Sequence, residues 1–224
     1  MGRVSQAQAE ENRRRVVDTA SRLFREQGTH VSVADLMKAA GLTHGAFYKQ
    51  FASKEALVDE VTAHVFDEIA RLNAAGLERH DGQRDAAQRA LIDTYLSVEH
   101  RDNAADGCPV AALAIDIARG PEGREARRTY AEGVAEFAAF LAPAEAVAGG
   151  EAVAPAEAVG GVGGVGGVGG GEGVGGGEGV GGGEGGLARL CTLVGALVLS
   201  RATQGSPLSE EILAAAHAAL TEAG

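Results

Sequence analysis

Cysteine is scarce in this sequence, which has only two among 224 residues, Cys108 and Cys191. The two lie far apart and neither belongs to a CxxC pair, which excludes a disulfide framework and the common structural zinc sites. We therefore expect two free thiols and no bound metal.

Long hydrophobic runs are missing as well. The longest apolar stretch covers residues 187–200 and is interrupted by Arg189, so it is too short to span a membrane. No apolar segment follows the charged residues near the N-terminus, and no secretory signal is recognisable. These features predict a cytoplasmic protein without a membrane partner.

Signatures of enzymes are also absent. Residues 161–166 match the dinucleotide-binding pattern GxGxxG in letters only, because neither a strand before them nor a helix after them is predicted. No GxSxG, no HExxH and no cluster of metal ligands occurs. The sequence thus predicts no catalytic residues and no cofactor.

Glycine, in contrast, is abundant but concentrated in one place. Of 34 glycines, 21 lie between Gly149 and Gly186, where short Val-Gly repeats offer few side chains to bury. Such a tract loses more backbone entropy on folding than burial can offset, so we expect a disordered insert over 149–186 that joins two helices. The rest of the chain has enough apolar residues to build a core.

Apolar residues recur with a helical period in that remainder, and no long stretch alternates with period two. The fold class is therefore predicted to be all-α, with about nine helices. Ser32, Thr43, Ser53 and Ser209 are expected to cap helices, and Pro109 to stand in a first turn. The predicted helices lie at 16–28, 33–41, 44–50, 54–72, 91–96, from 109, 122–141, 187–203 and 209–222.

Positive charge is confined to one end of the chain. Residues 1–54 carry 9 basic and 5 acidic side chains, whereas residues 55–224 carry 11 basic and 26 acidic ones. A polyanion would be attracted to the basic end, and the acidic remainder would discourage nonspecific binding elsewhere.

The segment 32–51 has the pattern of a helix-turn-helix. Two short predicted helices flank a turn at Gly41, and small residues would let the second helix enter a major groove about 12 Å wide. A helical hairpin with a solvated basic face is the alternative, which the charge segregation disfavours. The candidate DNA-binding residues are Ser32, Lys38, Thr43, His44, Gly45, Tyr48, Lys49 and Lys54.

From about residue 12 to 69 the chain resembles the TetR family of bacterial transcriptional regulators. The resemblance is carried by Phe24, Gly28, Ser32, Ala40, Gly41, Thr43, Gly45, Tyr48, Phe51 and Lys54. It implies that Thr43, Tyr48 and Lys54 contact phosphates and that His44 and Lys49 face base edges. It also implies a DNA-binding domain over 9–71, with three helices before the linking one, and a regulatory domain over 72–224.

Family resemblance further implies a small-molecule effector and a homodimer built from the last two helices. Apolar residues on these helices exceed what one small domain easily covers, although they could instead complete a monomer core. The candidate interface residues are Leu190, Leu193, Val194, Leu197, Ile212, Leu213, Ala216 and Leu220.

A pocket in the second domain is expected from aromatic and polar residues on its helices. Its candidates are His64, Tyr95, Cys108, Asp116, Tyr130 and Phe137. The favoured interpretation is a repressor that its ligand releases from a palindromic double-stranded DNA operator. Two alternatives stay open: a redox or electrophile sensor acting through Cys108, and a helical ligand-binding protein that does not bind DNA.

Overall fold

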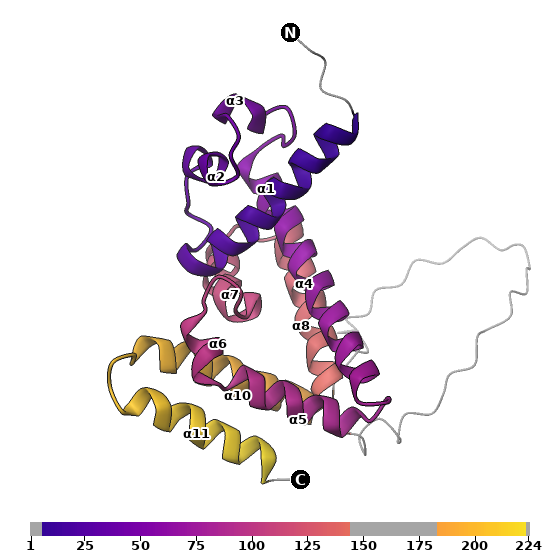
Figure 1. Ribbon diagram of the computed structural model, residues 1–224, viewed down its shortest axis with the longest axis vertical. Coiled ribbons are helices and arrows are strands. Elements are labelled where there is room, and N and C mark those ends of the chain that lie inside the picture. The colour runs from indigo at the N-terminus through magenta and orange to yellow at the C-terminus, as the bar shows by residue number, and fades with distance from the viewer. Residues whose placement is uncertain (1–5, 144–182, 223–224) are drawn as a thin grey trace, which may run out of the picture.

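The computed structural model describes residues 6–143 and 183–222, and every regular element in these two ranges is a helix (Figure 1). The predicted all-α fold class is confirmed. The helices are α1 Gln6–Gln27, α2 Val33–Ala39, α3 His44–Phe47, α4 Lys54–Arg79, α5 Arg84–Tyr95, α6 Val98–Asp102, α7 Pro109–Arg119, α8 Glu125–Leu141, α10 Glu184–Ala202 and α11 Leu208–Thr221.

The first three helices and the start of α4 form a small bundle at one end of the molecule (Figure 1). One face of α1 buries Val16, Ala20 and Phe24 at helical spacing. Phe47 and Leu57 complete the core of this bundle, and both are fully buried. Gly28 follows α1 with φ +81°, a conformation that glycine adopts without strain.

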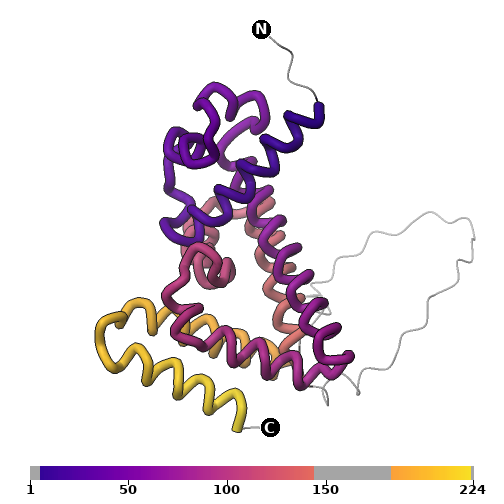
Figure 2. Tube along the Cα trace, viewed as in Figure 1, coloured from indigo at the N-terminus to yellow at the C-terminus, as the bar shows by residue number. Residues whose placement is uncertain are grey.

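Helix α4 runs from this bundle along one side of the molecule, with α8 beside it (Figure 2). The two helices approach closely at Gly133, where a Cβ atom would lie 2.1 Å from the Phe66 ring. Any side chain at position 133 would displace that ring, so the glycine sets the α4–α8 distance.

Helices α5, α6 and α10 form the opposite end, and α11 packs outside α10 (Figure 1). The core of this end contains Leu190, Leu193 and Leu197 from α10, each no more than 3% exposed. Among the described helices, α10 is the one long and apolar enough to cross a membrane. Its face with Leu190, Leu193 and Leu197 is nevertheless buried against other helices of the protein.

Several expected helix bounds are corrected in the described ranges: α1 begins at Gln6 rather than at residue 16, α4 extends to Arg79 rather than to residue 72, and α5 begins at Arg84 rather than at residue 91. Short α6 was missed, because its five residues are too few to show a period; Ser97 caps it. Helix α10 begins at Glu184 rather than near Leu187, so the last three residues of the expected insert are helical. Gly186 is buried there, and a Cβ on it would lie 2.1 Å from the Ala138 carbonyl oxygen. Positions 149–182 of that insert lie outside the described residues.

Candidate DNA-binding surface and ligand pocket

The helix-turn-helix is formed by α2 and the short α3. Ser32 caps α2 by accepting a hydrogen bond from the Asp35 amide at 3.1 Å. Gly41 ends this helix with φ +69°, which turns the chain toward α3. Thr43 occupies the N-cap position of α3 and is exposed, and its side chain makes no capping hydrogen bond.

An aromatic series leads from the core of the bundle to its surface. Phe51 stacks on Phe47 at 5.3 Å, Phe47 meets Tyr48 edge-to-face at 5.2 Å, and Tyr48 meets His44 at 5.6 Å between ring centroids. Phe47 is fully buried, whereas Tyr48 is 62% exposed. The buried rings therefore hold the two exposed ones in place on α3.

Seven of the eight candidate DNA-binding residues are exposed, and Lys54 is partly buried in the first turn of α4. A Cβ atom on Gly45 would meet nothing within 4 Å, and Gly45 has no positive φ. The fold therefore does not require glycine at this position.

Arg13 has a positioning role that the sequence did not reveal. Its guanidinium donates to the Gln50 carbonyl oxygen, pairs with Glu60 of α4 and lies 4.4 Å from the Phe51 ring centroid. One side chain thus joins α1, the end of the recognition segment and α4. From the sequence, the basic residues near the N-terminus suggested only an attraction for polyanions, because a pattern of charges does not show which residues an arginine contacts in the fold.

Replacing Arg13 by methionine is expected to lower the free energy of unfolding by about 1–2 kcal/mol, since the Gln50 carbonyl and Glu60 lose their partner while the side-chain stem is kept. Arg14→Met is the control, because exposed Arg14 pairs only with Glu11 on its own helix and should change stability by less than about 0.5 kcal/mol. Urea unfolding of both variants measures the difference; equal stabilities would contradict the positioning role.

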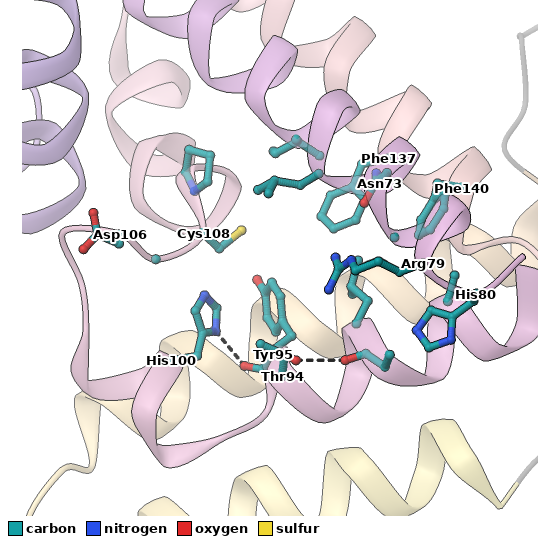
Figure 3. A pocket seen from close by; sticks show the side chains of 18 residues that line it. Asn73, Arg79, His80, Thr94, Tyr95, His100, Asp106, Cys108, Phe137 and Phe140 are labelled. Atoms are coloured by element: carbon teal, nitrogen blue, oxygen red, sulfur yellow. Dashed lines mark hydrogen bonds between the residues drawn. The ribbon is translucent and has the colours of Figure 1, made fainter.

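A cavity of about 350 Å³ lies between α4, α5, the segment before α7, and α8 (Figure 3). Its apolar wall includes Ile69, Leu91, Phe137 and Phe140. Its size falls at the lower end of the range for small-molecule sites. Among the candidate pocket residues, Tyr95, Cys108 and Phe137 line it.

The other three candidates lie elsewhere. His64 faces Asp18 of α1 at 3.4 Å, Asp116 accepts the Thr29 amide at 2.5 Å, and the Tyr130 hydroxyl donates to the Val110 carbonyl at 2.7 Å. Their helical positions suggested an inner face, but that face contacts neighbouring helices rather than the cavity. His100, another polar residue expected from the sequence to serve a pocket, does line it.

The polar end of the cavity consists of Tyr95, His100 and Cys108. The buried Tyr95 hydroxyl is directed toward the Cys108 sulfur but makes no hydrogen bond of ordinary geometry within the described ranges (Figure 3). Burial raises the pKa of Tyr95 well above its usual value and raises the pKa of the Cys108 thiol. Both groups are therefore neutral near pH 7.

Three contacts connect the surroundings of this cavity to the N-terminal bundle. Asp106, which lines the cavity, pairs with Arg22 of α1. Arg25 of α1 pairs with Glu68 of α4 and donates to the Ala105 carbonyl at 3.4 Å. Asp116 holds the turn after α1 through the Thr29 amide. A displacement of the segment before α7 would therefore act directly on α1.

The candidate interface residues need correction. Leu190, Leu193, Leu197, Leu213 and Ala216 are at most 9% exposed in the single chain, so they belong to its own core. Val194, Ile212 and Leu220 are partly buried against that core. Apolar composition alone could not distinguish the inner face of α10 from its outer one.

The outer face of α10 carries an apolar stripe that shares Val194 with the candidate interface residues. Leu187 and Val198 are 44% and 47% exposed, Cys191 is exposed and Val194 is partly exposed. These four residues follow the spacing i, i+4, i+7, i+11, which places them on one side of the helix. They are called the α10 stripe below.

Comparison with known sequences identifies the N-terminal bundle. Residues 16–61 match the family model described as bacterial regulatory proteins, tetR family. The chain is 40% identical over 62 residues to the HTH-type transcriptional regulator AcrR of Shigella flexneri, and 38% identical over 87 residues to the HTH-type transcriptional repressor KstR2 of Rhodococcus jostii (strain RHA1). These segments are 27% and 37% of this chain but only 29% and 40% of the two relatives.

Solved structures share the fold over nearly the whole chain. The reduced form of E. coli NemR has a TM-score of 0.64 at 19% identity, covering 94% of this chain and 96% of that one. A TetR-family transcriptional regulator from Agrobacterium tumefaciens has a TM-score of 0.62 at 20% identity, covering 96% of both chains. The sequence match thus places residues 16–61 in the tetR family of bacterial regulatory proteins, and the solved structures show that the same fold continues beyond them.

Proposed function

We propose that this protein is a sequence-specific, DNA-binding transcriptional repressor that acts as a homodimer in the cytoplasm and leaves its operator when a small molecule occupies the cavity. The main support is the exposed face of α3, where Tyr48, His44 and Gly45 are presented by buried aromatic rings and by the Arg13 contacts. A groove-binding helix needs this combination of exposed polar groups and a rigid base.

Within this proposal, the exposed residues divide into two roles. Thr43, Tyr48 and Lys54 contact phosphates, with Lys54 at the start of α4, where the helix dipole adds to its charge. His44 and Lys49 face base edges, and Ser32 and Lys38 flank the groove. The names of the relatives, a regulator and a repressor, support a role in transcriptional regulation rather than catalysis.

Selection of bound sequences from a random pool of double-stranded DNA tests the proposed function, because a repressor of this kind should enrich one palindrome. Lys54→Ala and Tyr48→Phe should then weaken binding to enriched and random DNA alike. Lys54→Ala should also reduce the slope of log affinity against log salt by about one. His44→Ala should instead alter the enriched sequence.

The matched control for charge is Arg128→Ala, because Arg128 is exposed on α8 and, among the described residues, its ion pairs are with Glu125 and Glu132 of the same helix. This variant should keep the affinity and the salt slope of the wild type. A pool without enrichment, or a Lys54→Ala protein indistinguishable from the control, would rule out the proposed docking.

Release by a ligand would use the contacts between the cavity and α1. A ligand that fits the cavity only when the segment before α7 is displaced would move Asp106 and Asp116. Their contacts with Arg22 and Thr29 would transmit this movement to α1. The spacing of two recognition helices in a dimer must match about 34–36 Å, so a small tilt of the N-terminal bundle suffices to lose the operator. The ligand can shift the protein toward the displaced state only to the extent that it binds this state more tightly than the undisplaced one.

The thiol-sensor alternative is less well supported. Cys108 is 6% exposed and its pKa is raised by burial, whereas a reactive thiolate needs access and a lowered pKa. The solved structure of NemR is that of a reduced form, so the alternative is worth measuring. Under the pocket proposal, Cys108→Ser should retain release by a natural ligand, and oxidant should not release the wild type.

A further inference from the structure

The Tyr95 hydroxyl has the Cys108 sulfur, a weak acceptor, beside it, but makes no hydrogen bond of ordinary geometry within the described ranges. Tyr95 is only 7% exposed, its oxygen has no hydrogen-bond partner there, and Figure 3 shows its side chain directed into the cavity. Leaving a buried hydroxyl unpaired is unfavourable. A polar atom of a bound molecule would remove this penalty.

The charge around the cavity favours an anion. Among the described residues, no carboxylate lies within ion-pair distance of Arg79, whose Nε donates to its own helix at the Ala75 carbonyl. Asp106 is the acidic residue that lines the cavity, and Arg22 already neutralises it. A cationic ligand would meet an uncompensated guanidinium, whereas an anionic one would pair with it.

A second arginine adds positive charge behind the polar end of the cavity. Arg201 is half-buried and donates to the carbonyls of Arg101 and His100 at 3.0 and 3.1 Å, with no ion pair in the described part of the chain. Burial lowers the pKa of His100 and the nearby Arg201 lowers it further, while the 2.6 Å hydrogen bond between its Nδ1 and the Tyr95 carbonyl oxygen opposes this shift. The neutral imidazole is therefore favoured near pH 7. The N-terminus of α7, at Cys108 and Pro109, also directs its positive end toward this region.

Most of the remaining wall is apolar and aromatic, although Asn73, His80 and Thr94 also line the cavity. Leu91 comes from α5 and Phe137 and Phe140 from α8, while Ile69 and Leu72 cover the α4 side. These side chains would contact a hydrocarbon body but could not satisfy a second polar group.

We propose that the cavity binds a small apolar carboxylic acid in its ionised form, with the carboxylate between Arg79 and the Tyr95 hydroxyl and the hydrocarbon body against Phe137, Phe140 and Leu91. This inference rests on the proposed function in taking the cavity as the effector site. It adds the chemical class of the effector, which family membership does not supply.

Calorimetric titration of the purified full chain without DNA tests this inference. The probes are two matched sets, phenylbutanoate with its amide and amine, and octanoate with its amide and amine. In at least one set the acid should bind about tenfold more tightly than the amide, because the charge-assisted hydrogen bonds to Arg79 are lost in the amide. The amine should not bind measurably.

Two variants locate the carboxylate. Arg79→Gln should reduce the affinity for the acid to that for the amide, and Tyr95→Phe should weaken acid binding severalfold. Arg71→Gln is the matched control, since Arg71 is also exposed on α4 and bonds to its own helix at the Asp67 carbonyl, yet does not line the cavity. It should bind the acid as the wild type does.

The outcomes separate this inference from the proposed function. If neither acid binds, if the amides bind as tightly as the acids, or if Arg79→Gln leaves the preference for the acid intact, the inference is overturned while operator binding stands. If the acids bind as expected but no palindrome is enriched, the proposed function fails and the carboxylate site remains.

Discussion

Replacing Gly186 by alanine is expected to lower the free energy of unfolding by about 2–3 kcal/mol, although alanine is the better helix former. A Cβ at this position would lie 2.1 Å from the Ala138 carbonyl oxygen, 3.0 Å from its carbon and 3.1 Å from the Ala142 nitrogen. All three are backbone atoms, so no side-chain rotation can relieve the contact. The start of α10 must separate from α8.

The control for this substitution is Gly76→Ala in α4. A Cβ on Gly76 would meet nothing within 4 Å, so the gain in helix propensity, up to about 1 kcal/mol, should appear without opposition. Thermal unfolding at one fixed protein concentration compares the variants, because association also contributes to apparent stability. A Gly186→Ala protein as stable as the Gly76→Ala protein would show that α10 and α8 do not pack as described.

Local sequence signals predicted local structure well. Ser32 and Ser53 cap α2 and α4 through the amides of Asp35 and Ala56, and Pro109 opens α7, as expected. Gly28 and Gly41 end their helices with positive φ. These features depend on residues within one turn of each other, so a single sequence contains the information.

Signals that depend on tertiary partners were read less accurately. Ser209 was expected to cap the last helix, but it is buried, donating to the Ser200 carbonyl at 2.6 Å and accepting from Arg101 at 2.9 Å. Asp116 and His64 have the polarity of pocket residues, yet they contact Thr29 and Asp18 of the N-terminal bundle. Helical spacing indicates which residues share a face and leaves open what that face meets.

The same limit applies to the candidate sites. The helix-turn-helix could be located from sequence because its glycines and aromatic residues lie within one short segment. The cavity combines side chains from α4, α5, α6, the segment before α7, and α8, and only three of its six predicted residues line it. The contribution of Arg79 could not be predicted, because its importance comes from having no acidic partner across the described part of the fold.

Introducing a charge into the α10 stripe is expected to have the largest effect on DNA binding. We expect Val198→Glu to convert the proposed homodimer to a monomer, because two copies of the stripe related by a two-fold axis would each bury a carboxylate at the contact. A monomer engages one half-site at a time, so affinity for a palindromic operator should fall about a hundredfold or more. Affinity for a single half-site should change little.

Ile115→Glu is the matched control, since Ile115 is 57% exposed on α7, outside the stripe. Analytical ultracentrifugation should show a dimer for this control and a monomer for Val198→Glu, with unchanged helicity in both.

Cys191 supplies an independent measurement, because it is exposed within the stripe whereas Cys108 is buried. A short bismaleimide should therefore couple two wild-type chains and fail to couple Cys191→Ser. A dimeric Val198→Glu protein with full operator affinity would show that the two copies meet through another surface, since no partner could accommodate a buried carboxylate on the stripe without a compensating charge.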